Sequence, residues 1–425
     1  MSNTQVGQQR VDVKQRTKRE KEAAKGRDWT SWPRYDAAVT GFKGYWYPVG
    51  WSISFAKKSV QRIELCDATL AMVRDADGKI KAVSDRCPHR GVPLSQGTQE
   101  WPGTITCAYH GWTYDLTDGS LRAVITDGPD SPMCGKASVQ AYAVEERNEL
   151  VWVYMPIADE EAPPLERDLP EEWLGGHRFT LGGRIGIRKG NWRFAAENGY
   201  DEGHAKYLHR TSLWRTFKSM PTWSKTHIED RGRWIYRVQD DVHWEADFPG
   251  LGHRTNDRWY KLKPPAQKQG TVSNIGNTGG AKKIDPVIAA MKVPGFASIS
   301  LPGVLRIVYP QFIHYEFYVP VGADRHRYIG VMIQFKTGLA GWWYRFRYLA
   351  GIRWLFHGNF SNQDAWMVEA TDAPPERLYR PDISLIAWRR LCERGDERMP
   401  LGSPDGAGAA DAALTLRLQG SADVD

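Results

Sequence analysis

The sequence predicts an α+β protein in which a small antiparallel β domain precedes a larger domain of helices packed on an antiparallel sheet. The 425 residues correspond to about two to three domains of roughly 150 residues each, and 41% are hydrophobic. Short β-rich runs separated by Asp-Gly turn signals dominate residues 45–157. Longer strand-like runs and segments of helical period dominate the remainder, which predicts the second domain.

Composition and charge exclude several classes of protein. The net charge is +7, but the densest basic run, residues 14–25, also carries acids and is typical of a solvated helix. We therefore expect an acidic protein partner and no nucleic acid. Five cysteines, an odd number in a long chain, do not make a disulfide scaffold. The polar N-terminus and the lack of any apolar stretch near the ~20 residues of a membrane span predict a cytoplasmic protein without a membrane segment.

The chain divides into four segments. Residues 1–40 are polar and charged at first and predict a helical or flexible extension. Residues 41–160 form the predicted β domain, and residues 161–400 form the larger domain. The acidic, proline-rich stretch 158–173 marks the boundary between them. Residues 401–425 are small and polar and predict a mobile tail.

The larger domain combines both kinds of periodicity. Residues 187–210 predict a strand end that leads into an amphipathic helix. Strands of one sheet are predicted at 234–241, 298–310, 313–321 and 327–335, and helices at 341–356 and 360–372.

The first metal-binding pattern is Cys87-x-His89, seventeen residues, then Cys107-x2-His110. Each half supplies one thiolate and one imidazole from a short loop. A Rieske [2Fe–2S] cluster needs this set, with two cysteines on one iron and two histidines on the other. The sequence therefore predicts such a cluster in the β domain.

A Cys2His2 zinc site is the alternative for these four residues. Zinc fingers pair like ligands, as C-x2–4-C and H-x3–5-H, whereas here each half is mixed, and the setting is β-rich rather than helical. Glycines at Gly91 and Gly111 suit loops whose backbone approaches cluster sulfurs. Cys66, Cys134 and Cys392 have no such partners, and we expect core or surface roles for them.

The second pattern is Asp201-x2-His204-x4-His209. The two histidines lie five apart, so they share one metal only if the helix bends or loosens, which Gly203 permits. Two histidines and one carboxylate on one face of an iron leave positions open for dioxygen and substrate, as in non-haem Fe(II) oxygenases. Alone, each histidine fits a core or surface role equally well, and the cluster motif in the same chain favours the metal site.

The third ligand has to come from elsewhere in the chain. Asp364 is the best candidate, because a lone carboxylate in an apolar helical segment is costly without a cation. A helix-surface acid is the plain alternative, and Glu369 is the next candidate ligand. Asp201 can share a helical face with His204 and hold its other ring nitrogen, or it can be an exposed aspartate at a helix start.

With these motifs the chain resembles the α (terminal oxygenase) subunits of Rieske non-haem iron aromatic-ring-hydroxylating oxygenases, over roughly residues 40–395. It is most similar to the homotrimeric, carbazole dioxygenase-type branch. One departure is the histidine spacing, which is five here, as in the wider family, and four in the carbazole-type motif. The matching stretches are GYWYPV, WRFAAENGYD, SISLPGVLRI, YEFYVPV, GNFSNQDAW and LIAWRRL.

The resemblance implies an N-terminal antiparallel β Rieske domain and a C-terminal helix-on-antiparallel-sheet (START/Bet v1-like) catalytic domain. It implies a [2Fe–2S] cluster and a mononuclear Fe(II), with electrons from a ferredoxin, an NAD(P)H-dependent ferredoxin reductase, or both. The expected reaction is O2-dependent cis-dihydroxylation or angular dioxygenation of an aromatic substrate, in aromatic hydrocarbon catabolism. The expected assembly is a homotrimer.

The resemblance also implies roles for individual residues. His110 of one subunit is expected to communicate with His204 of the next through Asp201. Small or apolar residues are expected to line the substrate pocket, with core packing an equally good reading of each; they are Gly199, Ala205, Leu305, Ile307 and Phe360.

Two other functions stay open from the residues. A Rieske protein that only transfers electrons needs the β domain alone, and the second metal-binding pattern is the feature that argues against it. A Rieske monooxygenase or demethylase acting on a substituted ring uses the same iron site as a dioxygenase. The chain has no G-x-G-x-x-G after a predicted strand, so we expect nicotinamide oxidation on another polypeptide.

Overall fold

The structure is a computed structural model. It describes residues 32–56, 59–158, 160–174, 176–213, 221–255, 270–272, 284–371 and 377–395. The predicted mobile tail, 401–425, and all but the end of the predicted extension, 1–40, lie outside the described residues. Within the described part of the chain, no helix combines the length and apolar character that a membrane crossing requires.

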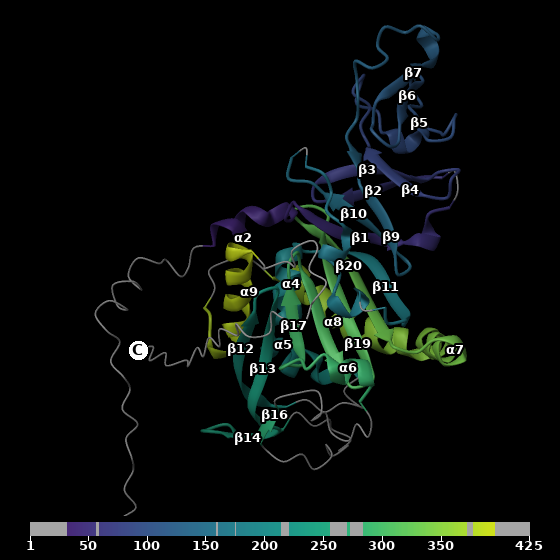
Figure 1. The fold of residues 1–425 in the computed structure, drawn as a ribbon. Coiled ribbons are helices and arrows are strands. Elements are labelled where there is room, and N and C mark those ends of the chain that lie inside the picture. The colour runs from purple at the N-terminus through teal and green to yellow at the C-terminus, as the bar shows by residue number, and fades with distance from the viewer. Residues whose placement is uncertain are drawn as a thin grey trace, which may run out of the picture.

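Three small antiparallel sheets form the N-terminal β domain, in the upper part of Figure 1. Their orders are β1-β10-β9, β2-β3-β4-β8 and β5-β6-β7. The Asp-Gly turn signals lie where expected, with Gly78 between β3 and β4 and Gly119 between β6 and β7, both at positive φ. The strands are β1 (Tyr45–Trp51), β2 (Val60–Leu65), β3 (Ala68–Arg74), β4 (Ile80–Ser84), β5 (Thr104–Thr106), β6 (Trp112–Asp115), β7 (Leu121–Val124), β8 (Ala141–Tyr142), β9 (Val144–Arg147) and β10 (Leu150–Met155).

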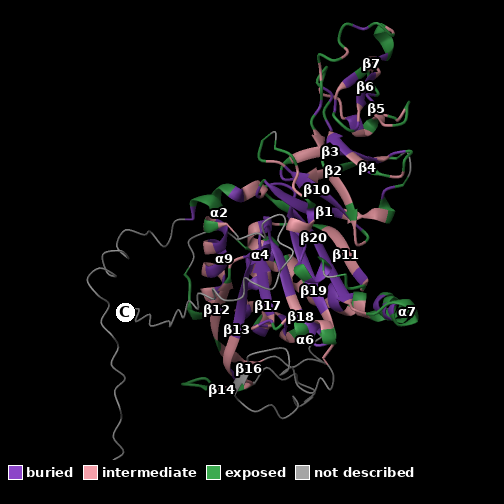
Figure 2. Cartoon of the chain, viewed as in Figure 1, coloured by how far each residue is buried: buried purple, intermediate pink, exposed green. Residues whose placement is uncertain are grey.

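A long antiparallel sheet forms the framework of the C-terminal domain. Among the described residues its order is β11-β20-β19-β18-β17-β13-β12, with β16 also paired to β13. Figure 2 shows that its central strands are largely buried. The strands are β11 (Thr180–Lys189), β12 (Trp223–Arg231), β13 (Trp234–His243), β16 (Gly270–Val272), β17 (Ala297–Ser300), β18 (Val304–Tyr309), β19 (Phe312–Pro320) and β20 (Arg325–Gln334), with a separate hairpin of β14 (Glu245–Phe248) and β15 (Gly252–Thr255).

Three helices cover one face of this sheet. Helix α4 contacts β17 to β20, α8 contacts β11, and α9 contacts β12 and β13. The α-helices are α2 (Pro33–Ala37), α3 (Glu171–Leu174), α4 (Trp192–Tyr200), α5 (Glu202–Tyr207), α6 (Pro286–Ala290), α7 (Gly338–Arg347), α8 (Ser361–Ala370) and α9 (Ile383–Arg394). Two π-helical segments, η9 (Tyr348–Ile352) and η10 (Trp354–Phe360), join α7 to α8. Short 3₁₀ turns are η1 (Ala38–Thr40), η2 (Ser52–Ser54), η3 (Leu94–Gln96), η4 (Ile125–Asp127), η5 (Leu165–Arg167), η6 (Leu208–Thr211) and η11 (Arg380–Asp382).

Three predicted elements are broken where the sequence suggested continuity. The strand predicted at 298–310 is a hairpin, because the chain turns between β17 and β18 at Leu301–Gly303. The helix predicted after residue 187 is two helices, because Asp201 has extended backbone angles. The helix predicted over 341–356 changes from α to π winding at Tyr348. Hydrophobic periodicity does not mark these breaks, although the Pro302-Gly303 pair is a turn signal at the first of them.

The two domains share a packed boundary. At one face of the sheet, Trp152 of β10 and Trp173 of α3 both make edge contacts with Phe317 of β19. The β2–β3 turn caps the end of the sheet, since the Cys66 N–H donates to the Pro320 carbonyl at 3.0 Å. The tip around β5 to β7 has its own separate core. The base of the β domain is therefore continuous with the C-terminal core, and only the tip stands apart (Figure 1).

Candidate metal centres

Two loops of the same backbone form carry the first ligand set. The Cys87 N–H donates to the carbonyl five residues on, at 3.0 Å, and the Gly91 N–H donates back to the Cys87 carbonyl at 2.8 Å. The second loop closes in the same way: the Cys107 N–H donates to the Trp112 carbonyl at 2.8 Å, and the Gly111 N–H donates to the Cys107 carbonyl at 3.1 Å. Both glycines have positive φ, +75° and +67°, which favours glycine over residues with a Cβ. The repeated Cys-to-Gly spacing thus produces two matched loops.

The four predicted cluster ligands lie together at the tip of the β domain. Cys87 and Cys107 are buried, 1% and 3% exposed, and belong to the tip core. His89 is exposed and His110 is half-buried, and their ring centroids are 4.6 Å apart. The Tyr114 hydroxyl lies 3.3 Å from the Cys87 sulfur. The thiols therefore face inward and the imidazoles form the outer edge of the site.

This geometry fits a cluster better than a single zinc ion. Tetrahedral zinc ligands at about 2.0–2.3 Å from the metal lie within about 4 Å of one another. Among the described residues, no three of these four bring ligand atoms within 4.8 Å of one another. The Nδ1 atom of His110 is buried without a hydrogen-bond partner in the described structure, as expected of a nitrogen that ligates a metal. The donor set and its spread fit a two-iron cluster.

The second ligand set depends on two interruptions of the helix that carries it. Helix α4 ends at Tyr200, and the Asp201 carboxylate caps α5 by accepting from the N–H groups of Gly203 and His204 at 2.8 and 2.7 Å. Helix α5 ends at Tyr207, and the 3₁₀ turn η6 carries the second histidine. The predicted loosening occurs, but it lies after Tyr207 and not at Gly203.

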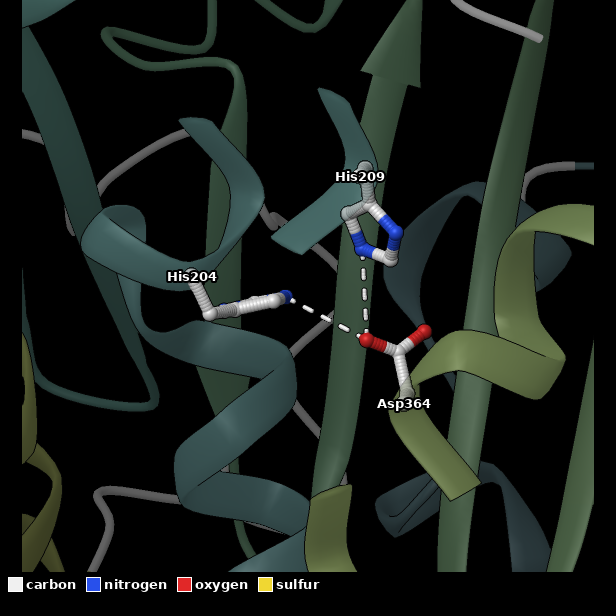
Figure 3. A group of neighbouring side chains, drawn as sticks. All are labelled: His204, His209 and Asp364. Atoms are coloured by element: carbon white, nitrogen blue, oxygen red, sulfur yellow. Dashed lines mark ion pairs between the residues drawn. The ribbon is translucent and has the colours of Figure 1, made fainter. Parts of the chain in front are cut away.

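His204, His209 and Asp364 converge on one point, as Figure 3 shows. The Asp364 Oδ1 atom lies 3.5 Å from His204 Nε2 and 3.2 Å from His209 Nε2. One ligand atom from each residue lies within 4.8 Å of the others. Asp364 comes from α8, which packs on α4. Two imidazoles and one carboxylate in this arrangement fit a mononuclear iron with open coordination positions.

Neighbouring side chains orient both imidazoles. The Asp201 carboxylate lies 3.4 Å from His204 Nδ1, while it also caps α5. The Gln363 Oε1 atom lies 3.0 Å from His209 Nδ1. For His209, an acceptor at Nδ1 places the proton there and leaves Nε2 free as a ligand, which is the usual arrangement around metal-bound histidine. His204 Nδ1 has no hydrogen-bond partner among the described residues, and its contact with Asp201 is an electrostatic pairing.

Electrostatics favour charged carboxylates at this site. Burial alone would raise the pKa of Asp201, but the His204 imidazole and two backbone N–H groups lower it to about 2. Burial likewise acts to raise the pKa of Asp364, but the two imidazoles and the Asn198 amide, which donates at 3.2 Å, hold it below its usual value. Both groups are therefore anions suited to a cationic centre.

The sequence did not single out Gln363 or Asn198. Gln363 precedes a proposed ligand, and Asn198 opens the motif that contains the two histidines. Their neighbourhood was the only signal, because amides are common on exposed helix faces. Glu369, the alternative third ligand, is half-exposed and pairs with Lys189 at 2.7 Å, outside the group.

The predicted pocket residues come from α4, α5, β18 and η10. Leu305 and Ile307 project from β18 toward the helices, and a Cβ added to Gly199 of α4 would lie 3.1 Å from Leu305. Phe360 stacks on His209 with ring centroids 3.7 Å apart. The remaining residue, Ala205, is half-buried in α5. Gly199 also has a packing role, since an added Cβ would overlap the Tyr318 hydroxyl.

Two family models match the chain. A Rieske [2Fe–2S] domain matches residues 45–141, and a homotrimeric ring hydroxylase matches residues 156–241. The terminal oxygenase component CarAa of carbazole 1,9a-dioxygenase from Metapseudomonas resinovorans is 30% identical over 383 residues, which are 86% of this chain and 94% of that protein.

Solved structures agree with this relation. The terminal oxygenase of carbazole 1,9a-dioxygenase from Nocardioides aromaticivorans IC177 superposes with a TM-score of 0.72 at 27% identity, covering 87% of this chain and 98% of that one. The oxygenase in a reduced oxygenase–ferredoxin complex of carbazole 1,9a-dioxygenase superposes with a TM-score of 0.71 at 26% identity, covering 87% and 93%. The chain therefore belongs to the Rieske non-haem iron aromatic-ring-hydroxylating oxygenases, as a terminal oxygenase component whose cofactors are a [2Fe–2S] cluster and a mononuclear iron.

Proposed function

We propose that this protein oxygenates a polycyclic aromatic substrate in the cytoplasm, by cis-dihydroxylation or angular dioxygenation. The observation that carries the proposal is the convergence of His204, His209 and Asp364 within 4.8 Å in a chain that also carries the cluster loops. When bound, the cluster supplies single electrons and the iron supplies dioxygen activation.

We assign the residues as follows. The domain that holds the cluster is residues 41–160, and the catalytic domain is residues 161–400. The cluster ligands are Cys87, His89, Cys107 and His110, and the iron ligands are His204, His209 and Asp364. Asp201 and Gln363 hold the two imidazoles in the required tautomer and orientation.

The proposed position of the substrate is between the helix-facing side of β18 and Phe360. The proposed lining is Gly199, Ala205, Leu305, Ile307 and Phe360. Apolar walls around the iron position suit a flat hydrophobic ring and exclude water from the reacting atoms.

Oxygen incorporation tests this proposal. The purified protein, with a ferredoxin and an NADH-dependent reductase, is given a panel of bicyclic and tricyclic aromatics under ¹⁸O₂. We expect products that carry two labelled atoms. One labelled atom would indicate a monooxygenase or demethylase, and rapid cluster reduction without any product would indicate an electron-transfer protein.

We propose a ferredoxin as the electron donor, by similarity to the oxygenase–ferredoxin complex of the carbazole enzyme. Arg86 and Arg90 are exposed and line a surface hollow of about 520 Å³ beside Cys87 and His89. An acidic partner at this hollow would approach the outer imidazole edge of the cluster.

Charge reversal at this hollow tests the docking site. Arg86→Glu and Arg90→Glu should each slow cluster reduction by ferredoxin, and the wild-type rate should fall as salt rises, because exposed charges are screened over about 10 Å at 0.1 M salt. Stopped-flow absorbance measures the rate. Arg178→Glu, an exposed position in the other domain, is the control. A salt-independent rate, or equal effects of all three variants, would contradict the docking site.

A further inference from the structure

Three buried polar side chains in the catalytic domain have unpaired polar atoms. His314 and His357 are 0% exposed, and none of their four ring nitrogens has a hydrogen-bond partner among the described residues. Tyr348 is 1% exposed, and its hydroxyl is also without a partner there. Other buried polar atoms of the described residues are also unpaired, but these three side chains are neighbours, and buried polar groups in native proteins pair with protein, ordered water or a ligand.

The three side chains come from different elements and lie close together. The His314 ring, on β19, is 5.8 Å from the His357 ring on η10. The Tyr348 ring, on η9, is 6.0 Å from the same His357 ring. Both helical elements have π winding, which is rare and is frequently found at functional sites. We call His314, His357 and Tyr348 the polar trio.

The polar trio adjoins the proposed substrate cavity. His314 lies directly opposite Ile307 on the neighbouring strand and therefore shares its helix-facing side of the sheet. The His314 ring contacts Phe356, which stacks on Phe360, the ring that lies against the iron ligand His209. Two aromatic rings therefore separate His314 from an iron ligand.

The surroundings do not satisfy or ionise the two imidazoles. The carboxylate of Glu316 is 3.7 Å from His314 Nε2, too long for a hydrogen bond, and it accepts from Tyr318 and Tyr328 instead. Arg184 donates to the backbone carbonyl of His357 and not to its ring. Nothing in the described structure therefore completes the hydrogen bonding of the trio.

Both imidazoles are neutral. Burial lowers the pKa of His314 well below its usual value, and burial followed by the nearby guanidinium of Arg188 lowers that of His357 to about 3. A neutral imidazole offers one N–H donor and one acceptor nitrogen, and a tyrosine hydroxyl offers both.

A metal is not the missing partner. Two imidazoles would need further ligands, and in the described part of the chain no cysteine or carboxylate places a ligand atom within 4.8 Å of both imidazoles together, since Glu316 approaches His314 alone. An uncharged polar group that both donates and accepts fits the trio, because it pairs with neutral groups without bringing a charge into a buried site.

We propose that the polar trio is the specificity-determining end of the substrate cavity and binds an uncharged hydroxyl or keto oxygen carried by the aromatic substrate. This inference rests on the proposed function, since it places the oxygenated ring at the iron and the polar substituent against His314, His357 and Tyr348. The preferred substrates are thus oxygen-substituted polycyclic aromatics. A site built to hydrogen-bond a substituent rejects an analogue that lacks it, because its own polar groups then stay unpaired.

Matched ligands test the inference without chemistry. Calorimetry on the holoenzyme under anaerobic conditions compares naphthalene with 2-naphthol and fluorene with 9-fluorenone, and uses 2-naphthoate as the charged probe. We expect the oxygen-bearing member of at least one pair to bind about tenfold tighter or more than its hydrocarbon. We expect 2-naphthoate to bind more weakly than 2-naphthol, because its charge would be buried beside neutral groups.

Substitutions assign the preference to the trio. Tyr348→Phe removes a single oxygen atom, and His314→Phe replaces both ring nitrogens by carbon in a ring of similar size, so each should reduce the ratio of oxygen-bearing to hydrocarbon affinity toward one. His243→Phe is the control, since His243 already pairs with Asp241 and lies in β13. If His314→Phe does not fold, Tyr348→Phe alone decides.

Three results would overturn the inference: no preference for the oxygen-bearing member in either pair, tighter binding of 2-naphthoate, or a preference that survives both variants. The labelled-oxygen assay keeps this outcome separate from the proposed function. If unsubstituted aromatics are turned over and no binding preference is found, the proposed oxygenase function stands and only the proposed polar subsite is contradicted.

Discussion

Replacing His204, His209 or Asp364 by alanine is expected to abolish oxygenation and leave the cluster spectrum intact. Each variant removes one of three ligand atoms that lie within 4.8 Å of one another. The cluster loops are in the tip of the β domain, which has its own core, so their folding does not depend on these residues. Iron content, acid-labile sulfide and visible absorbance report the two centres separately.

Glu369→Gln is the matched control for the carboxylate. Glu369 lies on α8 with Asp364, but it is half-exposed and pairs with Lys189 at 2.7 Å. We expect this variant to keep its iron and nearly full activity, since an exposed ion pair contributes little to stability. Full iron content and turnover in Asp364→Ala would show that the third ligand is another group. A purified protein that contains zinc and shows neither acid-labile sulfide nor cluster absorbance would contradict the whole assignment.

Asp201→Asn is expected to leave both metal centres bound and to lower turnover by roughly 10- to 100-fold, the usual effect of altering a group that orients a metal ligand. Asparagine caps helices as well as aspartate does, so α5 should persist. The substitution removes the negative charge 3.4 Å from His204 Nδ1. Asp201→Ala, which removes the cap as well, should also lower thermal stability, and this difference separates the electronic role from the structural one.

Asp201 is also the proposed bridge between subunits. The tip that carries the cluster ligands is well separated from α4 and α5 in one chain (Figure 1). One of the two family models that match the chain is described as a homotrimeric ring hydroxylase. We expect a head-to-tail ring in which the cluster of one subunit faces the iron of the next, with Asp201 between His110 of one chain and His204 of the other.

Mixed rings test this path. Cys107→Ser lacks the cluster, and His204→Ala lacks the iron site. In randomly assembled rings of equal parts, about a quarter of the sites join an intact cluster to an intact iron site across a boundary, so about a quarter of wild-type activity should return. A mixture of His204→Ala with Asp364→Ala, both defective at the iron, is the control and should stay inactive. No recovery in the first mixture, or a fully active monomer, would refute the cross-subunit path.

The sequence by itself predicted the two cluster loops, the histidine pair of the iron site, and, through its periodicity, the β domain with its turns and the helix-on-sheet class of the larger domain. The loops and the histidine pair are local features. The cluster loops close on themselves through hydrogen bonds that span four and five residues, and His204 and His209 belong to one short segment. Residue type and spacing are enough to predict each loop and the histidine pair, because the residues of each lie within five positions of one another in the chain.

Only the tertiary structure decided how the iron site is assembled. Asp364 lies beside the histidines because α8 packs against α4 on the same face of the sheet. Gln363 contacts His209, although the two residues are 154 positions apart in the chain. The breaks at Asp201 and Tyr207, the continuous core between the domains and the polar trio also come from packing. Hydrophobic periodicity records which faces are buried but not what each face meets, so contacts between distant segments are fixed only when the whole sheet and its helices are in place.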